Sequence, residues 1–223
     1  MIYIIKHREC ETPKLKGYKT LKVGDICDYL DEDNINHLNS YLSEATASYY
    51  LWKHCKDEYV GQVHYRRFLL DNGEILSYDK AVEYLKEYDI LFAEKYYVGN
   101  GIYNNLRSEI GNDINKRTLD KYYDILCEKE PDLRDYFSQT WFYPRNMFVC
   151  KKELFDKYCE WLFPLIIPIT EQFIKEDKEV NQKNKLVGYL YERLFTYWII
   201  KNDLKVKTFE YNETGERLPM MEV

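Results

Sequence analysis

The sequence predicts an α/β protein in which helices flank a mainly parallel β-sheet and a helical part occupies the C-terminal half. Short apolar runs alternate with helical patterns over the first hundred residues, an order typical of a parallel sheet with crossover helices. Two long stretches of helical periodicity follow in the second half. The 223 residues, 45 % of them hydrophobic and 31 % charged, are enough for one folded domain.

The first half of the chain contains the alternation. Buried or half-buried strands are expected at 2–5, 21–23, 59–64 and 89–92, and helices at 39–54 and 78–87. Asn39 or Ser40 is a suitable N-cap for the helix 39–54. Helical spacing within that segment places four residues on one polar face: Asn39, Ser43, Thr46 and Tyr50.

The second half is more helical. Residues 114–140 read as helix without strong apolar stripes, and Asn146–Cys150 reads as one more strand. Long helices are expected at about 151–175 and 182–202, and Pro164 and Pro168 should break or kink the first of them. The segment 204–209 is expected to return as an edge strand, followed by a polar, loose tail from Asn212.

Composition excludes several classes of protein. The net charge of −6 argues against general nucleic-acid binding, which needs a basic surface. The six cysteines form no CxxC pair and have no zinc-site spacing, which favours reduced thiols. The N-terminal apolar run is too short for a signal peptide, and the longest apolar run, 161–169, is too short for a bilayer. We therefore expect a cytoplasmic protein, with peripheral contact to the inner face of the plasma membrane left open.

The segment from Tyr59 to Phe68 carries the strongest local signal. A short apolar strand ends in the polar cluster His64, Tyr65, Arg66 and Arg67. Arginine forks match phosphate oxygens, and ligands of α/β proteins bind at the carboxyl ends of strands. An arginine pair after a strand is also typical of a solvated loop or of ion pairs with nearby acids. The first interpretation predicts a phosphorylated ligand in an otherwise acidic protein.

Further short motifs extend this cluster into a longer pattern. They are, in order, Lys6-His7, Val23-Gly24-Asp25, Asp33-Asn34-Ile35, Leu38-Asn39, Ser43-Glu44 with Thr46-Ala47, Trp52-Lys53-His54, Val60-Gly61, His64-Tyr65-Arg66-Arg67-Phe68, Asn146-Met147-Phe148, Tyr158 with Trp161-Leu162-Phe163, and Gly188-Tyr189-Leu190 with Glu192-Arg193-Leu194. From residue 2 to about residue 200 the chain resembles the bacterial capsular and exopolysaccharide biosynthesis family. That family, with its HYRR and GYLxERL motifs, is regarded as GT-A-type glycosyltransferases although long described as a domain of unknown function.

This resemblance implies a single GT-A-like, Rossmann-like glycosyltransferase domain over 1–211, followed by the tail 212–223. Residues 1–100 would be the nucleotide-sugar half and 101–211 the acceptor or helical half. The implied reaction moves a hexose, with inversion favoured, to a lipid-linked or oligosaccharide acceptor. A UDP-linked donor is favoured, and galactofuranose is the donor sugar suggested for part of the family.

One departure from the family supports an alternative function. Relatives carry a His before an Asp-Leu pair in the middle segment, whereas the stretch 106–114 has no His. The alternative is a non-catalytic protein of a polysaccharide assembly locus that binds a nucleotide or a partner protein.

The resemblance also implies roles for particular residues. The residues expected to bind the donor are Lys6, His7, Asp25, Asn39, His64, Tyr65, Arg66 and Arg67. The strand ending at His64 lacks the Asp-x-Asp motif that holds a metal in many GT-A enzymes. Arg66 or Arg67, with Lys6, would then stabilise the leaving diphosphate in place of a metal. We assign no metal site, although Mn²⁺ or Mg²⁺ stays possible; the acidic run 31–33 is better interpreted as an exposed turn.

Glu192 is the first candidate for the general base, and Asp113 is the second. A structural ion pair between Glu192 and Arg193 is the competing interpretation. Glu44, expected to be buried or partly buried, would orient an arginine of the HYRR cluster, with Arg193 and Asn146 in further supporting roles. The aromatic run 141–143 is a candidate sugar-stacking wall, a membrane-facing patch or a lid packed on the fold.

Overall fold

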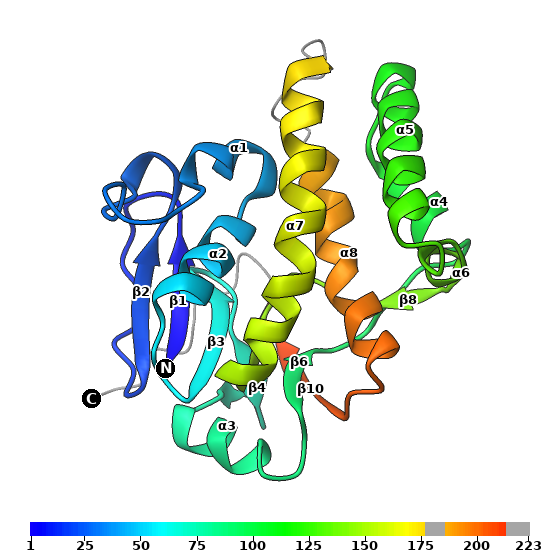
Figure 1. The fold of residues 1–223 in the computed structure, drawn as a ribbon. Coiled ribbons are helices and arrows are strands. Elements are labelled where there is room, and N and C mark those ends of the chain that lie inside the picture. Colours follow the sequence, from blue (N-terminus) through cyan, green and yellow to red (C-terminus); the bar gives the residue numbers. More distant parts are fainter. Residues whose placement is uncertain (177–185, 213–223) are drawn as a thin grey trace.

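Eight strands form the central sheet, in the order β2-β1-β3-β9-β6-β10-β4-β5 (Figure 1). The computed structural model describes residues 1–176 and 186–212. Its strands are β1 (Ile2–Lys6), β2 (Tyr18–Lys22), β3 (Tyr59–His64), β4 (Leu69–Asp71), β5 (Glu74–Ile75), β6 (Ile90–Ala93), β7 (Tyr96–Tyr97), β8 (Trp141–Phe142), β9 (Phe148–Lys151) and β10 (Val206–Tyr211). β7 and β8 pair as a separate two-stranded sheet.

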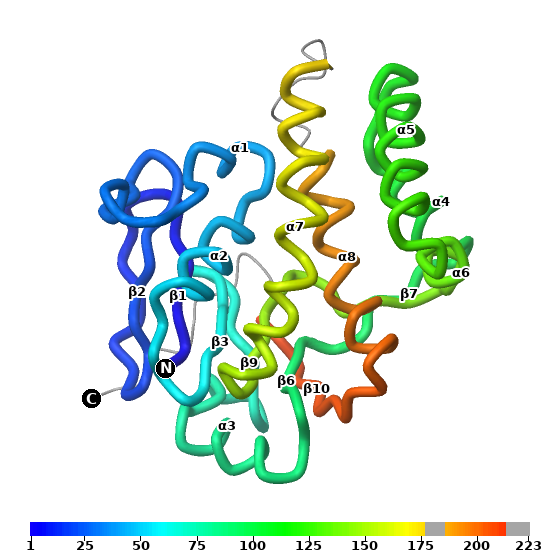
Figure 2. Tube along the Cα trace, viewed as in Figure 1, coloured from blue at the N-terminus to red at the C-terminus, as the bar shows by residue number. Residues whose placement is uncertain are grey.

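Helices cover the sheet. They are the 3-10 turns η1 (Gly24–Ile26) and η2 (Asn36–Leu38) and the α-helices α1 (Asn39–Leu42), α2 (Ala45–His54), α3 (Tyr78–Tyr84), α4 (Ile102–Glu109), α5 (Asp113–Lys129), α6 (Leu133–Ser138), α7 (Lys152–Glu176) and α8 (Leu186–Lys201). The long helices α5, α7 and α8 stand side by side, and α7 also contacts β3 and β9 (Figure 2). α1 lies against α8, and α2 lies against α7. Among the described residues, no helix has the length and apolar character needed to cross a membrane.

Strand direction decides which residues meet at the site. β1 is parallel to β2 and to β3, and β10 is parallel to β6. β9 lies between β3 and β6 and is antiparallel to both. The predicted α/β fold with a mainly parallel sheet is therefore confirmed, with β4 reversed beside β10 and β9 reversed at the centre of the sheet. Because of that reversal, the residues that precede β9 lie beside the residues that follow β3.

The sheet is buried where these strands meet. All five residues of β1 are buried, in keeping with the apolar run from Ile2 to Ile5 that precedes its last residue, Lys6. Gly61 of β3 allows close approach to β9, since a Cβ there would lie 2.9 Å from the carbonyl oxygen of Phe148 and 2.9 Å from a methyl group of Val149. No ordinary contact is that short, so the two strands would have to separate.

Gly61→Ala is expected to lower the free energy of unfolding by about 1–3 kcal/mol, because the added methyl group overpacks the junction between β3 and β9. Urea denaturation measures the change. Gly99→Ala is the matched control, since a Cβ at Gly99 meets nothing within 4 Å. Equal stability of the two variants would contradict this account of the junction.

The predicted helix 39–54 is wrong in one respect: it is two helices separated at Ser43. Ser43 has φ 51° and ψ −124°, a conformation that ends α1. Its carbonyl accepts hydrogen bonds from the Thr46 hydroxyl (2.8 Å) and from the Asn39 amide (3.0 Å). These side chains satisfy the carbonyl that the break exposes, so the chain turns sharply before α2.

Two other predictions in the second half are corrected. Pro164 and Pro168, which were expected to break or kink the helix, do not break α7, because it continues through both. Both prolines are exposed, so they lie on the solvent side while the other side of α7 packs against α2, α5 and α8. β10 is not an edge strand, because β4 pairs with it on the side away from β6.

Short elements were missed by the sequence prediction, namely α4, β4, β5, β7 and β8. The start of the predicted helix 182–202 and most of the tail 212–223 lie outside the described residues. Asn212 is described, and its side chain accepts a hydrogen bond from the Phe68 N–H (2.7 Å) and donates one to the Arg66 carbonyl (3.2 Å). The chain after β10 is thus joined to the segment that follows β3.

Candidate functional site

Two adjacent pockets lie at the carboxyl ends of β1 and β3. The first, here the α1 pocket, has a volume of about 230 Å³ and includes His7, Asn39, Ser40 and Tyr65. The second, the α8 pocket, has a volume of about 270 Å³ and includes Arg145, Gly188, Tyr189 and Glu192. One shared wall separates them; it consists of Ser43, Glu44, His64, Arg66 and Arg67. The HYRR cluster therefore borders both pockets.

Positive charge gathers at this shared wall. Arg66, Arg67 and Arg145 line the α8 pocket. Arg8 contacts the Tyr65 ring as Arg66 does, with guanidinium carbons 5.2 Å and 5.4 Å from the ring centre. The protein as a whole has a net charge of −6, so this group of arginines is a local concentration of positive charge. Guanidinium groups bind phosphate oxygens through pairs of parallel hydrogen bonds.

The break between α1 and α2 places the acidic part of the wall. Ser43 and Glu44, the residues at this break, line both pockets. A carboxylate oxygen of Glu44 accepts a hydrogen bond from the side chain of Asn146 (3.3 Å). Glu44 is half-buried, as the sequence predicted, and lines both pockets together with Arg66 and Arg67.

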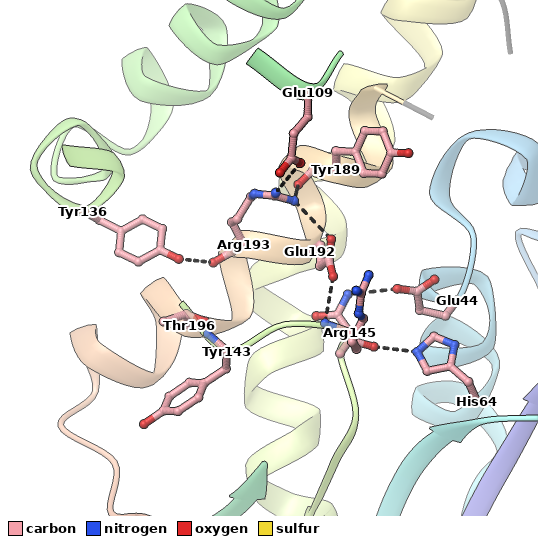
Figure 3. A network of polar contacts seen from close by, with 11 residues as sticks. Glu44, His64, Glu109, Tyr136, Tyr143, Arg145, Tyr189, Glu192, Arg193 and Thr196 are labelled. Carbon is pink, nitrogen blue, oxygen red and sulfur yellow. Dashed lines mark hydrogen bonds and ion pairs between the residues drawn. The ribbon is translucent and has the colours of Figure 1, made fainter. Parts of the chain in front are cut away.

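The main chain of Arg145 joins the HYRR motif to the GYLxERL motif (Figure 3). The ring nitrogen Nε2 of His64 donates to the Arg145 carbonyl oxygen (2.6 Å). The Arg145 N–H donates to Oε1 of Glu192 (2.7 Å). Since a carbonyl only accepts, His64 carries a proton on Nε2, and a neutral ring keeps Nδ1 as its acceptor.

Glu192 is also paired with Arg193. The guanidinium nitrogen Nη1 of Arg193 lies 3.1 Å from Oε2 of Glu192 and donates to the Tyr189 carbonyl (2.9 Å). Arg193 is buried, lies 3.8 Å from the carboxylate of Glu109, and stacks on the ring of Phe142 at 4.6 Å. The Glu192 side chain keeps 16 % of its surface exposed and lines the α8 pocket. The structural ion pair and the pocket carboxylate are thus both present.

Hydrogen bonds from behind the pocket hold α8. The Tyr136 hydroxyl donates to the Arg193 carbonyl (2.7 Å), and the Tyr143 N–H donates to the Thr196 hydroxyl (2.9 Å). Burial raises the pKa of Tyr136, so its hydroxyl stays neutral and remains a donor. Glu192 is therefore carried on a rigid helix, which favours a defined orientation in the pocket.

The structure brings together most of the residues that the sequence selected. These lie in the two pockets: His7, Asn39, Glu44, His64, Tyr65, Arg66, Arg67 and Glu192. Asn146 and Arg193 lie behind them, in contact with Glu44 and Glu192.

Three selected residues do not line either pocket. Lys6 is buried and its ammonium group lies 2.9 Å from Glu9. Asp25 is exposed in η1. Asp113 is exposed at the start of α5, with Lys116 at 3.9 Å. Across 1–176 and 186–212, no three His, Cys, Asp or Glu side chains are grouped as they would be to hold a metal ion.

The aromatic run after α6 is mostly inside the fold. Phe142 and Tyr143 are buried, and Trp141 is half-buried under the ammonium group of Lys95 at 3.8 Å. The exposed aromatic rings of this region are Tyr96 and Tyr97 on the paired strand β7. The arrangement agrees best with the third interpretation, an aromatic segment packed on the fold.

Sequence reasoning missed Arg145 and Tyr189, which line the α8 pocket, and Arg8, which contacts Tyr65 of the α1 pocket. Tyr189 belongs to the matched GYLxERL pattern but received no role. Arg8 follows the matched Lys6-His7 pair, so proximity to that motif could have indicated it. Arg145 precedes β9, and only the antiparallel direction of that strand brings it to the carboxyl end of β3.

Comparison with known proteins finds one family and one fold. The family model described as a domain of unknown function, DUF4422, matches residues 1–203. A solved structure, titled as the apo structure of the bifunctional glycosyltransferase WbbM, is similar with a TM-score of 0.76 and 24 % sequence identity. The similarity covers 99 % of this chain and 47 % of that one, so this chain spans about half its length. No curated protein matches the sequence. The two structures share a fold.

Proposed function

This chain belongs to the DUF4422 family, and we propose that it is a glycosyltransferase that uses a nucleotide-sugar donor. The observation that carries the proposal is the pair of pockets joined by an arginine-rich wall at the carboxyl ends of β1 and β3. The shared fold with a protein titled as a glycosyltransferase supports it, as does the resemblance of the HYRR and GYLxERL motifs.

The nucleoside is proposed to occupy the α1 pocket. Asn39 and Ser40 offer amide and hydroxyl groups there, and His7 and Tyr65 offer rings in edge-to-face contact at 5.4 Å. Such a mixture of rings and neutral polar groups suits a base and a ribose better than it suits a second charged group. The UDP-linked donor favoured by the resemblance remains the first choice.

The diphosphate is proposed to lie against the shared wall. Arg66 and Arg67 would bind the phosphate oxygens and stabilise the negative charge that develops on the leaving nucleoside diphosphate. Fixed guanidinium groups perform the same electrostatic task as a divalent cation in other transferases. Donor binding without added metal is the consequence.

Sugar transfer is proposed to occur in the α8 pocket. A Glu192 oxygen would take the proton of the acceptor hydroxyl while the acceptor oxygen forms a bond to the anomeric carbon. The bond from that carbon to the diphosphate oxygen breaks, and the nucleoside diphosphate leaves with the bonding electrons. The configuration inverts, in agreement with the inverting hexosyl transfer that the resemblance favours. The acceptor is proposed to be a lipid-linked or oligosaccharide intermediate of capsular or exopolysaccharide synthesis.

A panel of nucleotides tests the proposal. UDP, GDP, CDP and their hexose conjugates are compared by thermal denaturation, in excess chelator and in Mn²⁺ or Mg²⁺. A ligand present at 100 times its Kd stabilises the native state by about 2.7 kcal/mol. We expect the nucleotides of one base to raise the Tm, and to raise it as much in excess chelator as in the presence of metal. A shift that needs the metal would contradict the arginine-based site, and no shift with any nucleotide would favour the non-catalytic alternative.

A further inference from the structure

Arg145 and Asn146 are consecutive non-glycine residues with positive φ, at 73° and 49°. Residues other than glycine rarely adopt this backbone conformation, and they keep it only where surrounding contacts stabilise it. Ser43, on the opposite wall of the same pocket, also has a positive φ of 51°. Unusual backbone conformations of this kind cluster at ligand sites.

Four hydrogen bonds hold the pair. His64 and Glu192 bind the two main-chain polar groups of Arg145, at 2.6 Å and 2.7 Å (Figure 3). Asn146 is fully buried; its side chain donates to Glu44 (3.3 Å), and its carbonyl accepts from the side chain of Gln62 (3.4 Å). The Gln62 amide is oriented in turn by a hydrogen bond from the Ser48 hydroxyl (2.9 Å). Both peptide groups are thus fixed from β3, α2 and α8.

The side chain of Arg145 lies in the α8 pocket with Arg66 and Arg67. It comes from the segment before β9, whereas the other two follow β3, so the guanidinium groups approach the pocket from separate segments. Positively charged side chains that come from separate segments can contact an anion from more than one side. An anion with several oxygens, such as a diphosphate, matches that arrangement.

We infer that Arg145 binds a phosphate group of the ligand, and that His64 and Glu192 are positioning residues that aim it by holding its main chain. The inference rests on the proposed function only in taking the ligand to be a nucleotide; phosphate binding by Arg145 does not depend on it. Glu192 then has two separable effects: its charge can accept a proton, and its Oε1 accepts the Arg145 N–H. Glutamine keeps the second effect and loses the first, whereas alanine loses both.

Binding of inorganic pyrophosphate and of UDP, measured by calorimetry at low salt, tests the inference. Arg145→Ala is expected to lower pyrophosphate affinity by about tenfold or more. Arg145→Gly should do the same and should fold at least as readily, because glycine accepts the positive φ. Arg134→Ala is the control, since Arg134 is an exposed arginine paired with Asp124 at 3.0 Å and lies outside both pockets.

The positioning role has its own comparison. Glu192→Gln is expected to keep pyrophosphate affinity within about twofold, while Glu192→Ala lowers it at least about fivefold. His64→Gln keeps an N–H donor for the Arg145 carbonyl, so this variant should likewise bind pyrophosphate more tightly than His64→Ala does. Equal losses in the glutamine and alanine variants would overturn the positioning role, and wild-type affinity in Arg145→Gly would overturn phosphate binding. Pyrophosphate binding without binding of any nucleotide would overturn the proposed function while leaving the inference standing, whereas binding of neither would overturn both.

Discussion

Replacing both Arg66 and Arg67 by alanine is expected to lower the affinity for the preferred nucleoside diphosphate by about 100-fold or more, since each charge-assisted hydrogen bond contributes about 1.5–3 kcal/mol. The two side chains are the positively charged members of the wall that both pockets share, so each can reach a ligand that spans the two pockets. Calorimetric titration of the nucleotide selected by the thermal panel measures the effect. The loss should be larger at low salt than at high salt, because ions screen charge interactions.

The controls separate charge from folding. Lys16→Ala combined with Arg134→Ala also removes two positive charges, both of them exposed and paired with acids away from the pockets. Arg66→Lys combined with Arg67→Lys keeps the charge and loses the planar fork, so an intermediate affinity is expected. If the double alanine variant is folded and binds the nucleotide as well as the wild type does, the diphosphate does not lie at the HYRR cluster.

Glu192→Gln is expected to lower kcat by about 100-fold or more while donor affinity is largely retained. Glutamine keeps an oxygen for the Arg145 N–H but cannot take a proton from the acceptor hydroxyl. Turnover is measured as release of nucleoside diphosphate from the donor, with Kd measured separately. This division between kcat and Kd distinguishes a general base from a residue that only supports binding.

Asp113→Asn is the matched control for this prediction. Asp113 was the second candidate for the base, but its side chain is exposed and lies outside both pockets. Its replacement should leave turnover within about twofold, as is usual for surface substitutions away from special features. Near-normal turnover in Glu192→Gln, together with a large loss in Asp113→Asn, would assign the base to Asp113 instead.

The parts of this site that the sequence predicted depend on local signals. The strand at 59–64 and the polar residues after it are contiguous, so their place at a strand end follows once a parallel sheet is expected. Glu192 and Arg193 lie in one short motif, so the sequence placed both on the same helix and offered their ion pair as one interpretation, which the structure shows at 3.1 Å. Alternating apolar runs and helical patterns likewise predicted the α/β class before any tertiary contact was known.

The parts that were missed depend on tertiary contacts. Arg145 reaches the pocket because β9 runs against its neighbours, and strand direction has no local signature. Ser43 breaks a sequence that reads as one helix, because the hydrogen bonds of Asn39 and Thr46 stabilise the break. β10 was placed at an edge because β4 is only three residues long and was not recognised.

Transfer of an isotope-labelled sugar tests the central claim most directly. The purified protein is incubated in excess chelator with labelled UDP-hexoses and an extract of lipid-linked and free oligosaccharide acceptors. The account predicts label in the acceptor fraction with the wild-type protein, and its loss in Glu192→Gln and in the Arg66→Ala and Arg67→Ala double variant. No transfer and no donor hydrolysis with any nucleotide sugar, with chelator or with Mn²⁺ and Mg²⁺, would contradict a glycosyltransferase and leave a binding protein.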